Sequence, residues 1–375
     1  MQIKLDYRLV LHLVMLYPLS LAIISAFGKE PFFITAPYFL VVILLMIFSL
    51  LYKKNFKLRT WEFIQLSLAS LLFVISLINF SFVRYSLPIL FIVYIIVLQI
   101  FLSTYSTKIN HHNFKYFRHY FIFYILLSLV FVVFQLIKFK GEFRFEGFLG
   151  SPTVFSAFIV LFYILALENF KSLRQKFIWY IIVLVLVLLS KTRLMLLITL
   201  VLPILFFSID FWKLSLKKIL LVTTLILLFL YPAYKTVVDY FPNLVTMRYD
   251  KGDDKSYQLR YYLYSITQED FLRQDLVNTF LGQGNEHSRL FVLNELGIDL
   301  YPHNDFIRLI NDWGILGALL FFILIYRYGI KTKISLMVAI LYLIQFYSNL
   351  IFNLFFISVL IIVSTLYTSN TEKIK

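Results

Sequence analysis

The sequence predicts an all-α polytopic membrane protein with about 12 transmembrane helices and one large outer loop. Hydrophobic residues make up 61% of the 375 residues, and the mean hydropathy is +0.84, which is more apolar surface than a soluble domain of this size needs. Uncharged apolar runs recur along the chain, and each is long enough to cross a bilayer as a helix of about 20 residues. The runs are continuous rather than alternating, which favours helices over a β-barrel.

The first apolar run follows Met1 to Arg8 and has no small-residue cleavage site after it. We therefore interpret it as a retained helix and not as a removed signal peptide. The expected spans, in chain order, are residues 9–27, 32–52, 62–80, 86–104, 119–137, 151–168, 177–190, 194–209, 219–236, 306–326, 334–348 and 350–367.

The charge distribution predicts the orientation of these spans. A net charge of +15 would suggest a nucleic-acid partner in a soluble protein. With the N-terminus inside, however, the inner segments hold 20 Lys and Arg and five Asp and Glu, whereas the outer segments hold 15 of each. The whole surplus lies on one side, as the positive-inside rule predicts. We therefore expect both termini in the cytoplasm and no nucleic-acid partner. The chain has no cysteine, so thiolate and disulfide chemistry are excluded.

No linker or low-complexity tract divides the chain, so residues 1–375 are expected to form a single integral membrane domain. The large extracytoplasmic loop is predicted at 237–305, with a smaller one at 138–150. Within the large loop, apolar residues recur near helical spacing between Tyr257 and Phe280, which indicates one or two amphipathic helices. Gly282-Gln283-Gly284 is expected to end this segment, as glycine ends helices.

The outer boundary of the membrane is the expected place of the chemistry. The span centres contain almost no ionisable residue, whereas ion-coupled transporters usually carry one there. His303 lies where the large loop joins an apolar span, and its ring can accept a proton from an attacking hydroxyl near neutral pH. Asn304 and Asp305 can orient that ring or the substrate. The alternative interpretation is a surface histidine followed by two ordinary N-cap residues.

The outer segments also carry a set of cations suited to a diphosphate, because the planar guanidinium makes two parallel hydrogen bonds to phosphate oxygens. Arg144 and Arg193 are the leading candidates, since each lies close to the start of an apolar span. The alternative interpretation is that these cations are interfacial anchors. The whole set comprises Arg144, Lys191, Arg193, Arg260, Arg273, Arg289 and Arg308.

A metal or nucleotide site is not expected. Glu286 and His287, together with His303 and Asp305, could supply metal ligands, but their spacing matches no known pattern. Gly282-Gln283-Gly284 lacks the Gly-Lys-Ser/Thr sequence and the strand of a nucleotide-binding loop. The sequence therefore predicts neither a metal nor a cofactor.

Several short motifs occur in a recognisable order between about residues 140 and 325. Arg144-Phe145-Glu146-Gly147 precedes Ser151-Pro152, and Ser190-Lys191-Thr192-Arg193 matches a Ser-x-(Ser/Thr)-Arg turn. Arg260, then Gly282-Gln283-Gly284, then His303-Asn304 follow, ahead of a helix that contains Gly314-Ile315-Leu316-Gly317. In this order the chain resembles the O-antigen ligase and O-antigen polymerase superfamily of bacterial surface-polysaccharide assembly.

The resemblance implies a GT-C-like membrane glycosyltransferase in the bacterial cytoplasmic membrane, with an extracytoplasmic active site. It implies metal-independent transfer of a glycan from undecaprenyl diphosphate to an acceptor hydroxyl. Carried over by position, His303 is the catalytic residue, and Arg144, Arg193 and Arg260 hold the diphosphate, with Lys191 as an additional contact. Asn304 and Asp305 are the candidate acceptor-orienting residues.

The leading functional hypothesis is a polymerase that joins lipid-linked oligosaccharide repeat units into O-antigen, capsule or exopolysaccharide. Its donor and acceptor would both be undecaprenyl-diphosphate-linked oligosaccharides. Membrane lipids and a chain-length regulator are further candidate partners. The first alternative is a ligase that transfers finished polymer to lipid A core or another acceptor. The second is a lipid-linked oligosaccharide flippase, against which the uncharged span centres and the long outer loop argue.

Overall fold

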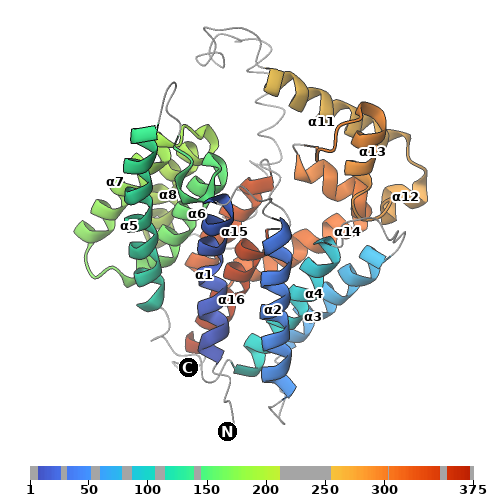
Figure 1. Cartoon of the computed structure of the whole chain (residues 1–375). Coiled ribbons are helices and arrows are strands. Elements are labelled where there is room, and N and C mark those ends of the chain that lie inside the picture. The colour runs from blue at the N-terminus through green and yellow to red at the C-terminus, as the bar shows by residue number, and fades with distance from the viewer. Residues whose placement is uncertain are drawn as a thin grey trace.

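The computed structural model describes a bundle of long helices with a group of shorter helices at one end (Figure 1). The described residues are 7–26, 32–51, 60–77, 87–105, 115–138, 145–211, 255–302, 304–346 and 353–371. Within them every regular element is a helix. The bundle helices before the large loop are α1 (Tyr7–Ala26), α2 (Phe32–Leu51), α3 (Thr60–Leu77), α4 (Leu87–Tyr105), α5 (Lys115–Lys138), α6 (Pro152–Ala166), α7 (Leu173–Leu189) and α8 (Arg193–Phe211).

Two short 3₁₀ helices flank α6, namely η2 (Gly147–Leu149) and η3 (Leu167–Asn169). The large loop contributes three helices, and three more follow it. The former are α11 (Lys255–Arg273), α12 (Leu276–Leu281) and α13 (His287–Leu296). The latter are α14 (Asp305–Gly329), α15 (Lys333–Gln345) and α16 (Leu354–Thr371).

The core of the bundle is made by helices that are buried around their whole circumference. All twelve residues from Phe155 to Ala166 in α6 are buried, as are all twelve from Ile334 to Gln345 in α15. Helices α2, α3, α5 and α7 instead expose large apolar side chains, such as Phe48, Leu71, Leu126 and Phe177. An apolar perimeter around an apolar core is typical of a bundle whose outer face contacts lipid.

The structure bears out a multi-pass helical membrane protein. Among the described residues, five helices are long and apolar enough to cross a membrane, namely α3, α4, α5, α6 with η3, and α14. Eleven of the twelve expected spans overlap a helix, and the twelfth, at 219–236, lies outside the described residues. The total of 12 spans and the GT-C-like architecture stay predictions.

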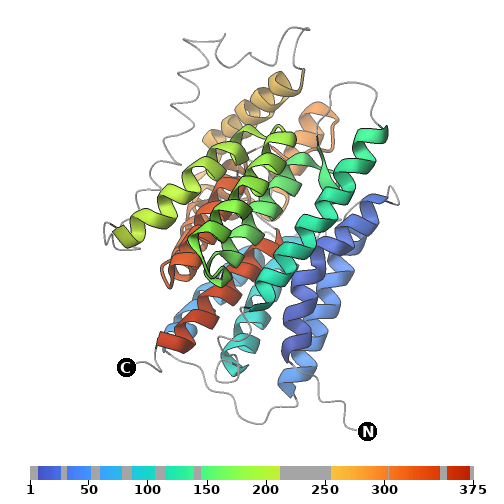
Figure 2. The ribbon, with the colours of Figure 1, turned by 90° about the vertical axis from the view of Figure 1, so that its left-hand side faces the viewer.

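Contacts at the two ends of α3 show which segments lie at each end of the bundle. At one end, the side chain of Asn285 contacts the last turn of α3 by donating to the carbonyl of Ser76 at 2.8 Å. At the opposite end, the amino group of Lys331 lies 4.2 Å from the ring centroid of Trp61, near the start of α3. Figures 1 and 2 show α11 at one end of the bundle, while α1 begins and α16 ends at the other. We refer to these as the loop end and the terminal end.

Helix α14 is bent at Gly314, where φ is 68° and ψ is 178°. The segment Asp305–Trp313 contacts the loop helices, and the segment after the bend enters the bundle. The expected span at 306–326 is therefore two helical segments. A left-handed φ is accessible to glycine because it has no Cβ, whereas other residues rarely adopt it. Gly314 thus sets the angle between the loop helices and the membrane bundle.

The motif Gly282-Gln283-Gly284 packs against α14 beside this bend. Gln283 and Gly284 donate backbone hydrogen bonds to the carbonyls of Asn311 and Asp312, both at 3.0 Å. These bonds occupy carbonyl groups next to the break in α14, where the regular i to i+4 pattern stops. A Cβ added to Gly282 would lie 2.3 Å from the carbonyl oxygen of Asp312. The motif therefore caps α12, as expected, and also joins α12 to α14 through backbone contact.

Candidate functional site

Four consecutive residues of α14, from Asn311 to Gly314, join the loop helices to the bundle. Asn311 contacts α11 and the residue that follows it. Its amide nitrogen donates to the carbonyl of Thr267 at 2.9 Å, and its amide oxygen accepts from Gln274 at 3.1 Å. Because both ends of this buried side chain are hydrogen-bonded, the orientation of α11 on α14 is specific.

Asp312 and Trp313 contact the segment that starts α13. The Oδ1 atom of Asp312 accepts from the backbone N–H of Ser288 at 2.9 Å and from its hydroxyl at 2.5 Å. The indole N–H of the fully buried Trp313 donates to the amide oxygen of Asn285 at 2.6 Å. Asn285 in turn donates to α3, so one hydrogen-bonded chain connects α14, the α13 segment and the bundle.

A buried ionic cluster surrounds Arg308, one turn before these residues. Its Nη2 atom lies 2.9 Å from Oε1 of Glu286, Nη1 lies 3.7 Å from Oδ1 of Asp305, and Nε lies 3.7 Å from Oδ2 of Asp312. All four side chains are almost fully buried. Removing one member of a buried ion pair typically costs about 3–5 kcal/mol, because the partner is left charged and unpaired. The cluster is therefore a strong constraint on the loop.

Tyr301 connects this cluster to the residues just before position 303. Its ring lies under the guanidinium of Arg308, with 3.8 Å from Cζ to the ring centroid, and its hydroxyl donates to Oε2 of Glu286. Burial raises the pKa of the Tyr301 phenol, so the hydroxyl remains a donor at neutral pH. The Cζ atom of Arg289 lies 5.0 Å from the centroid of the same ring. Arg289 also makes a two-point ion pair with Asp299, in which Nε lies 2.5 Å from Oδ1 and Nη2 lies 2.6 Å from Oδ2.

Position 303 is consequently flanked by fixed residues. On one side lies Tyr301, held by Arg308 and Glu286, followed by the buried Pro302. On the other side, Asn304 caps α14 by accepting from the N–H of Phe306 at 3.0 Å, and Asp305 is fully buried beside Arg308. A single guanidinium thus contacts the chain both before and after residue 303. His303 itself lies outside the described residues.

A second group of motif residues lies where α6, α7 and α8 meet. The backbone N–H of Phe145, the residue after Arg144, donates to the carbonyl of Leu189 at 2.9 Å. The hydroxyl of Thr192 lies 2.8 Å from that of Ser190 and donates to Ser156 on α6 at 2.9 Å. The described parts of the Arg144 loop and of the Ser190–Arg193 turn therefore adjoin.

The candidate phosphate contacts are described to different degrees. Lys191 is exposed at the tip of its turn and has φ of 51°, a left-handed conformation that is uncommon for lysine. Arg193 begins α8 and Arg260 lies in α11, but the side chains of both lie outside the described residues, as does the whole of Arg144. The diphosphate set of Arg144, Lys191, Arg193 and Arg260 stays a prediction.

Three other cations of the outer segments are paired with carboxylates of the loop. Arg308 and Arg289 belong to the cluster described above, and the exposed Arg273 lies 3.4 Å from Glu269. The geometry gives Arg308 and Arg289 a structural role in holding the loop. Arg308 and Arg289 are therefore not grouped with the four candidate phosphate contacts, Arg144, Lys191, Arg193 and Arg260.

The weak metal hypothesis finds no support among the described residues. No group of three or more His, Asp or Glu side chains there is arranged to hold a metal ion. His287 directs Nε2 to Asp270 at 2.9 Å, whereas Glu286 faces Arg308 and Tyr301. Glu286 and His287 are adjacent in sequence, but their side chains contact different partners.

Sequence reasoning considered Glu286 only as a possible metal ligand, and it assigned no role to Tyr301 or Asp312. One signal was present, because Asp305, Arg308 and Asp312 are spaced three and four residues apart on one helix. Such spacing places side chains on a common face and favours ion pairs. Glu286 comes from another segment, and no spacing rule connects it to Arg308.

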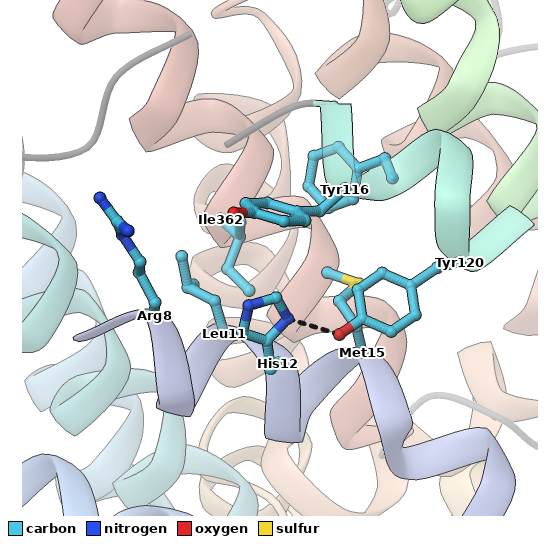
Figure 3. Close-up of a pocket in the computed structure, with 8 residues that line it drawn as sticks. Arg8, Leu11, His12, Met15, Tyr116, Tyr120 and Ile362 are labelled. Carbon is cyan, nitrogen blue, oxygen red and sulfur yellow. Dashed lines mark hydrogen bonds between the residues drawn. The ribbon is translucent and has the colours of Figure 1, made fainter. Parts of the chain in front are cut away.

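A small pocket at the terminal end is too small for a substrate. Figure 3 shows His12, whose Nδ1 lies 2.6 Å from the hydroxyl of Tyr120, with Arg8 and Tyr116 beside it. The pocket has a volume of about 20 Å³. That is room for roughly one water molecule.

Comparison with known proteins supplies one match. Residues 177–322 match a family model described as O-antigen ligase. The matched segment begins in α7 and ends in α14, so it contains positions 191, 193, 260 and 303 to 305 but not Arg144. No curated protein and no solved structure matches the chain.

Proposed function

We propose that this protein polymerises lipid-linked oligosaccharide repeat units, a proposal supported by the match of residues 177–322 to a family model described as O-antigen ligase. The donor is a glycan on undecaprenyl diphosphate, and the acceptor is a second lipid-linked repeat unit. The reaction takes place at the loop end, on the outer face of the cytoplasmic membrane.

The observation that carries the proposal is that Arg308 contacts both Tyr301 and Asp305, which precede and follow position 303 in the sequence. A general base must be held within hydrogen-bond reach of the hydroxyl that it deprotonates. Arg308 contacts the chain on both sides of position 303 and so holds the two flanking segments together. The loop end is also where polar groups meet the apolar bundle, as a lipid with a polar head requires.

In the proposed reaction the acceptor hydroxyl attacks the anomeric carbon of the donor glycan. A new C–O bond forms, the bond from that carbon to the diphosphate oxygen breaks, and undecaprenyl diphosphate leaves with the bonding electrons. The proton of the hydroxyl passes to the imidazole of His303. Arg144, Arg193, Arg260 and Lys191 offset the charge that develops on the diphosphate, an effect that is stronger near low-dielectric lipid.

The direct test uses purified full-length protein with lipid-linked repeat units and measures product length by gel electrophoresis. Wild-type protein should convert single repeats into longer chains. His303→Ala and Arg193→Ala should each abolish elongation. Arg273→Ala is the matched control, since Arg273 is an exposed arginine of the same loop region that lies 3.4 Å from Glu269. Full activity in both His303→Ala and Arg193→Ala would refute the site.

The ligase reaction is the second candidate, because the matching family model is described as O-antigen ligase. A strain that lacks the gene distinguishes the two reactions. Loss of polymer with single lipid-linked repeats remaining supports the polymerase. Accumulation of full-length polymer that stays on its lipid carrier supports the ligase.

A further inference from the structure

A groove between α6, α7 and α8 opens at the terminal end of the bundle, away from the proposed active site. Its volume is about 580 Å³. Tyr163 of α6 and Leu167 of η3 line it on one side, and Phe206 lines it from α8. The volume lies within the range of about 300–1,000 Å³ that is typical of small-molecule sites.

The groove faces the lipid-exposed side of the bundle. Leu173 and Phe177 of α7 line it and are 64% and 62% exposed, respectively. Only three residues of α7, namely Val183, Leu186 and Val187, are buried. An apolar groove whose rim lies on the membrane-facing surface is accessible to an acyl chain from the bilayer.

Basic residues surround one end of this groove. Arg174 and Lys176 line it, and Lys333 lies with its amino group 3.6 Å from the ring centroid of Phe206. Lys176 lies over the same ring at 5.1 Å. The α6–α7 connection and the start of α7, residues 167–180, hold three cations and one acid, Glu168. An anionic group at the mouth of the groove is therefore complementary in charge.

We propose that this groove binds a phospholipid with an anionic head group. One acyl chain lies among Tyr163, Phe177 and Phe206, and the phosphate lies against Arg174 and Lys176. The acyl chain gains little by leaving the bilayer, because lipid tails are as apolar as the groove. Selectivity must therefore come from the head group, and the cations should distinguish anionic from zwitterionic lipids. This inference does not depend on the glycosyl-transfer reaction.

Photo-crosslinking tests the proposal with full-length protein in phosphatidylcholine vesicles. The probes are phosphatidylglycerol and phosphatidylcholine, each with a diazirine in one acyl chain, and labelled peptides are identified by mass spectrometry. Phosphatidylglycerol should label residues 163–180 and 202–206 more strongly than phosphatidylcholine. Arg174→Gln with Lys176→Gln should remove this preference, by about fivefold for each cation lost.

Three controls separate the head-group effect from other causes. Arg174→Lys with Lys176→Arg keeps both charges and should keep the preference. Arg327→Gln removes a cation near the end of α14 that does not line the groove and should leave labelling unchanged. Size-exclusion profiles identify variants that fail to fold.

Two results would overturn the proposal. Equal labelling of the groove by both phospholipids would show that the cations select nothing. Labelling by a diazirine polyprenyl phosphate that excess phosphatidylglycerol does not displace would assign the groove to the tail of a polyprenyl lipid instead.

Discussion

The guanidinium of Arg308 lies 3.8 Å above the ring of Tyr301 and at the same time 2.9 Å from the carboxylate of Glu286, which accepts the hydroxyl of that tyrosine. These contacts join residues 286, 301 and 308 into one closed unit. The loop between α13 and α14 is thereby fixed at both ends. Position 303 falls between Tyr301 and Asp305 in the sequence, so we expect the placement of His303 to depend on this unit.

Arg308→Ala should destabilise the loop end by about 3–5 kcal/mol, because Glu286, Asp305 and Asp312 would then face one another without their shared cation. The measurement is thermal stability in detergent, followed by size-exclusion chromatography. Arg273→Ala serves as the control, since that exposed pair with Glu269 should contribute less than about 1 kcal/mol. Equal stability of the two variants would contradict a constraining role for the cluster.

Tyr301→Phe should leave the ring on Arg308 but remove the hydrogen bond to Glu286. If Tyr301 positions residue 303, the turnover number should fall while the apparent KM for the lipid-linked donor changes little. The expected loss of stability is about 1–3 kcal/mol, the cost of leaving a buried acceptor unsatisfied. Kinetics with purified repeat units provide the measurement. A higher KM at unchanged turnover would instead indicate a role in donor binding.

Gly314→Ala should prevent α12 from contacting α14. The new Cβ would lie 2.3 Å from the carbonyl oxygen of Phe280 and 2.5 Å from the nitrogen of Gly282, and both of these are backbone atoms that cannot rotate away. Gly297→Ala is a close control, because Gly297 has a similar φ of 65° with no atom within 4 Å of the added Cβ. The control isolates conformational strain of about 1–2 kcal/mol. The two variants are compared by expression level and thermal stability, and a similar loss in both would exclude steric contact as the cause.

Lys191→Asn should test the predicted phosphate contact without disturbing the turn. Lys191 has φ of 51°, and asparagine tolerates this left-handed conformation better than most residues. Removal of the charge should raise the apparent KM for the diphosphate-linked donor by about 10- to 150-fold, the equivalent of one charge-assisted hydrogen bond of about 1.5–3 kcal/mol. Lys191→Arg is the charge-retaining control. Unchanged kinetics in Lys191→Asn would exclude Lys191 from the diphosphate site.

The sequence by itself determined the class of the molecule and most of its helices. Continuous apolar runs have few structural options in lipid, because the bilayer core offers no water to hydrogen-bond the backbone. Each backbone N–H and C=O group must find its hydrogen-bond partner within the protein, and a helix provides one within the segment itself. Eleven expected spans overlap helices for this reason. The order of short motifs also predicted a resemblance to the O-antigen ligase and polymerase superfamily, and the match of residues 177–322 to a family model described as O-antigen ligase supports it.

Only the tertiary structure decided what the polar residues of the loop do. Glu286 and Arg308 are 22 residues apart, and Ser76 and Asn285 are 209 apart, so no local periodicity relates them. Arg289 and Arg308 have the same chemistry as the predicted phosphate contacts, yet they are neutralised by carboxylates from other segments. A charged side chain has many possible partners in sequence, and burial together with chain folding selects one of them.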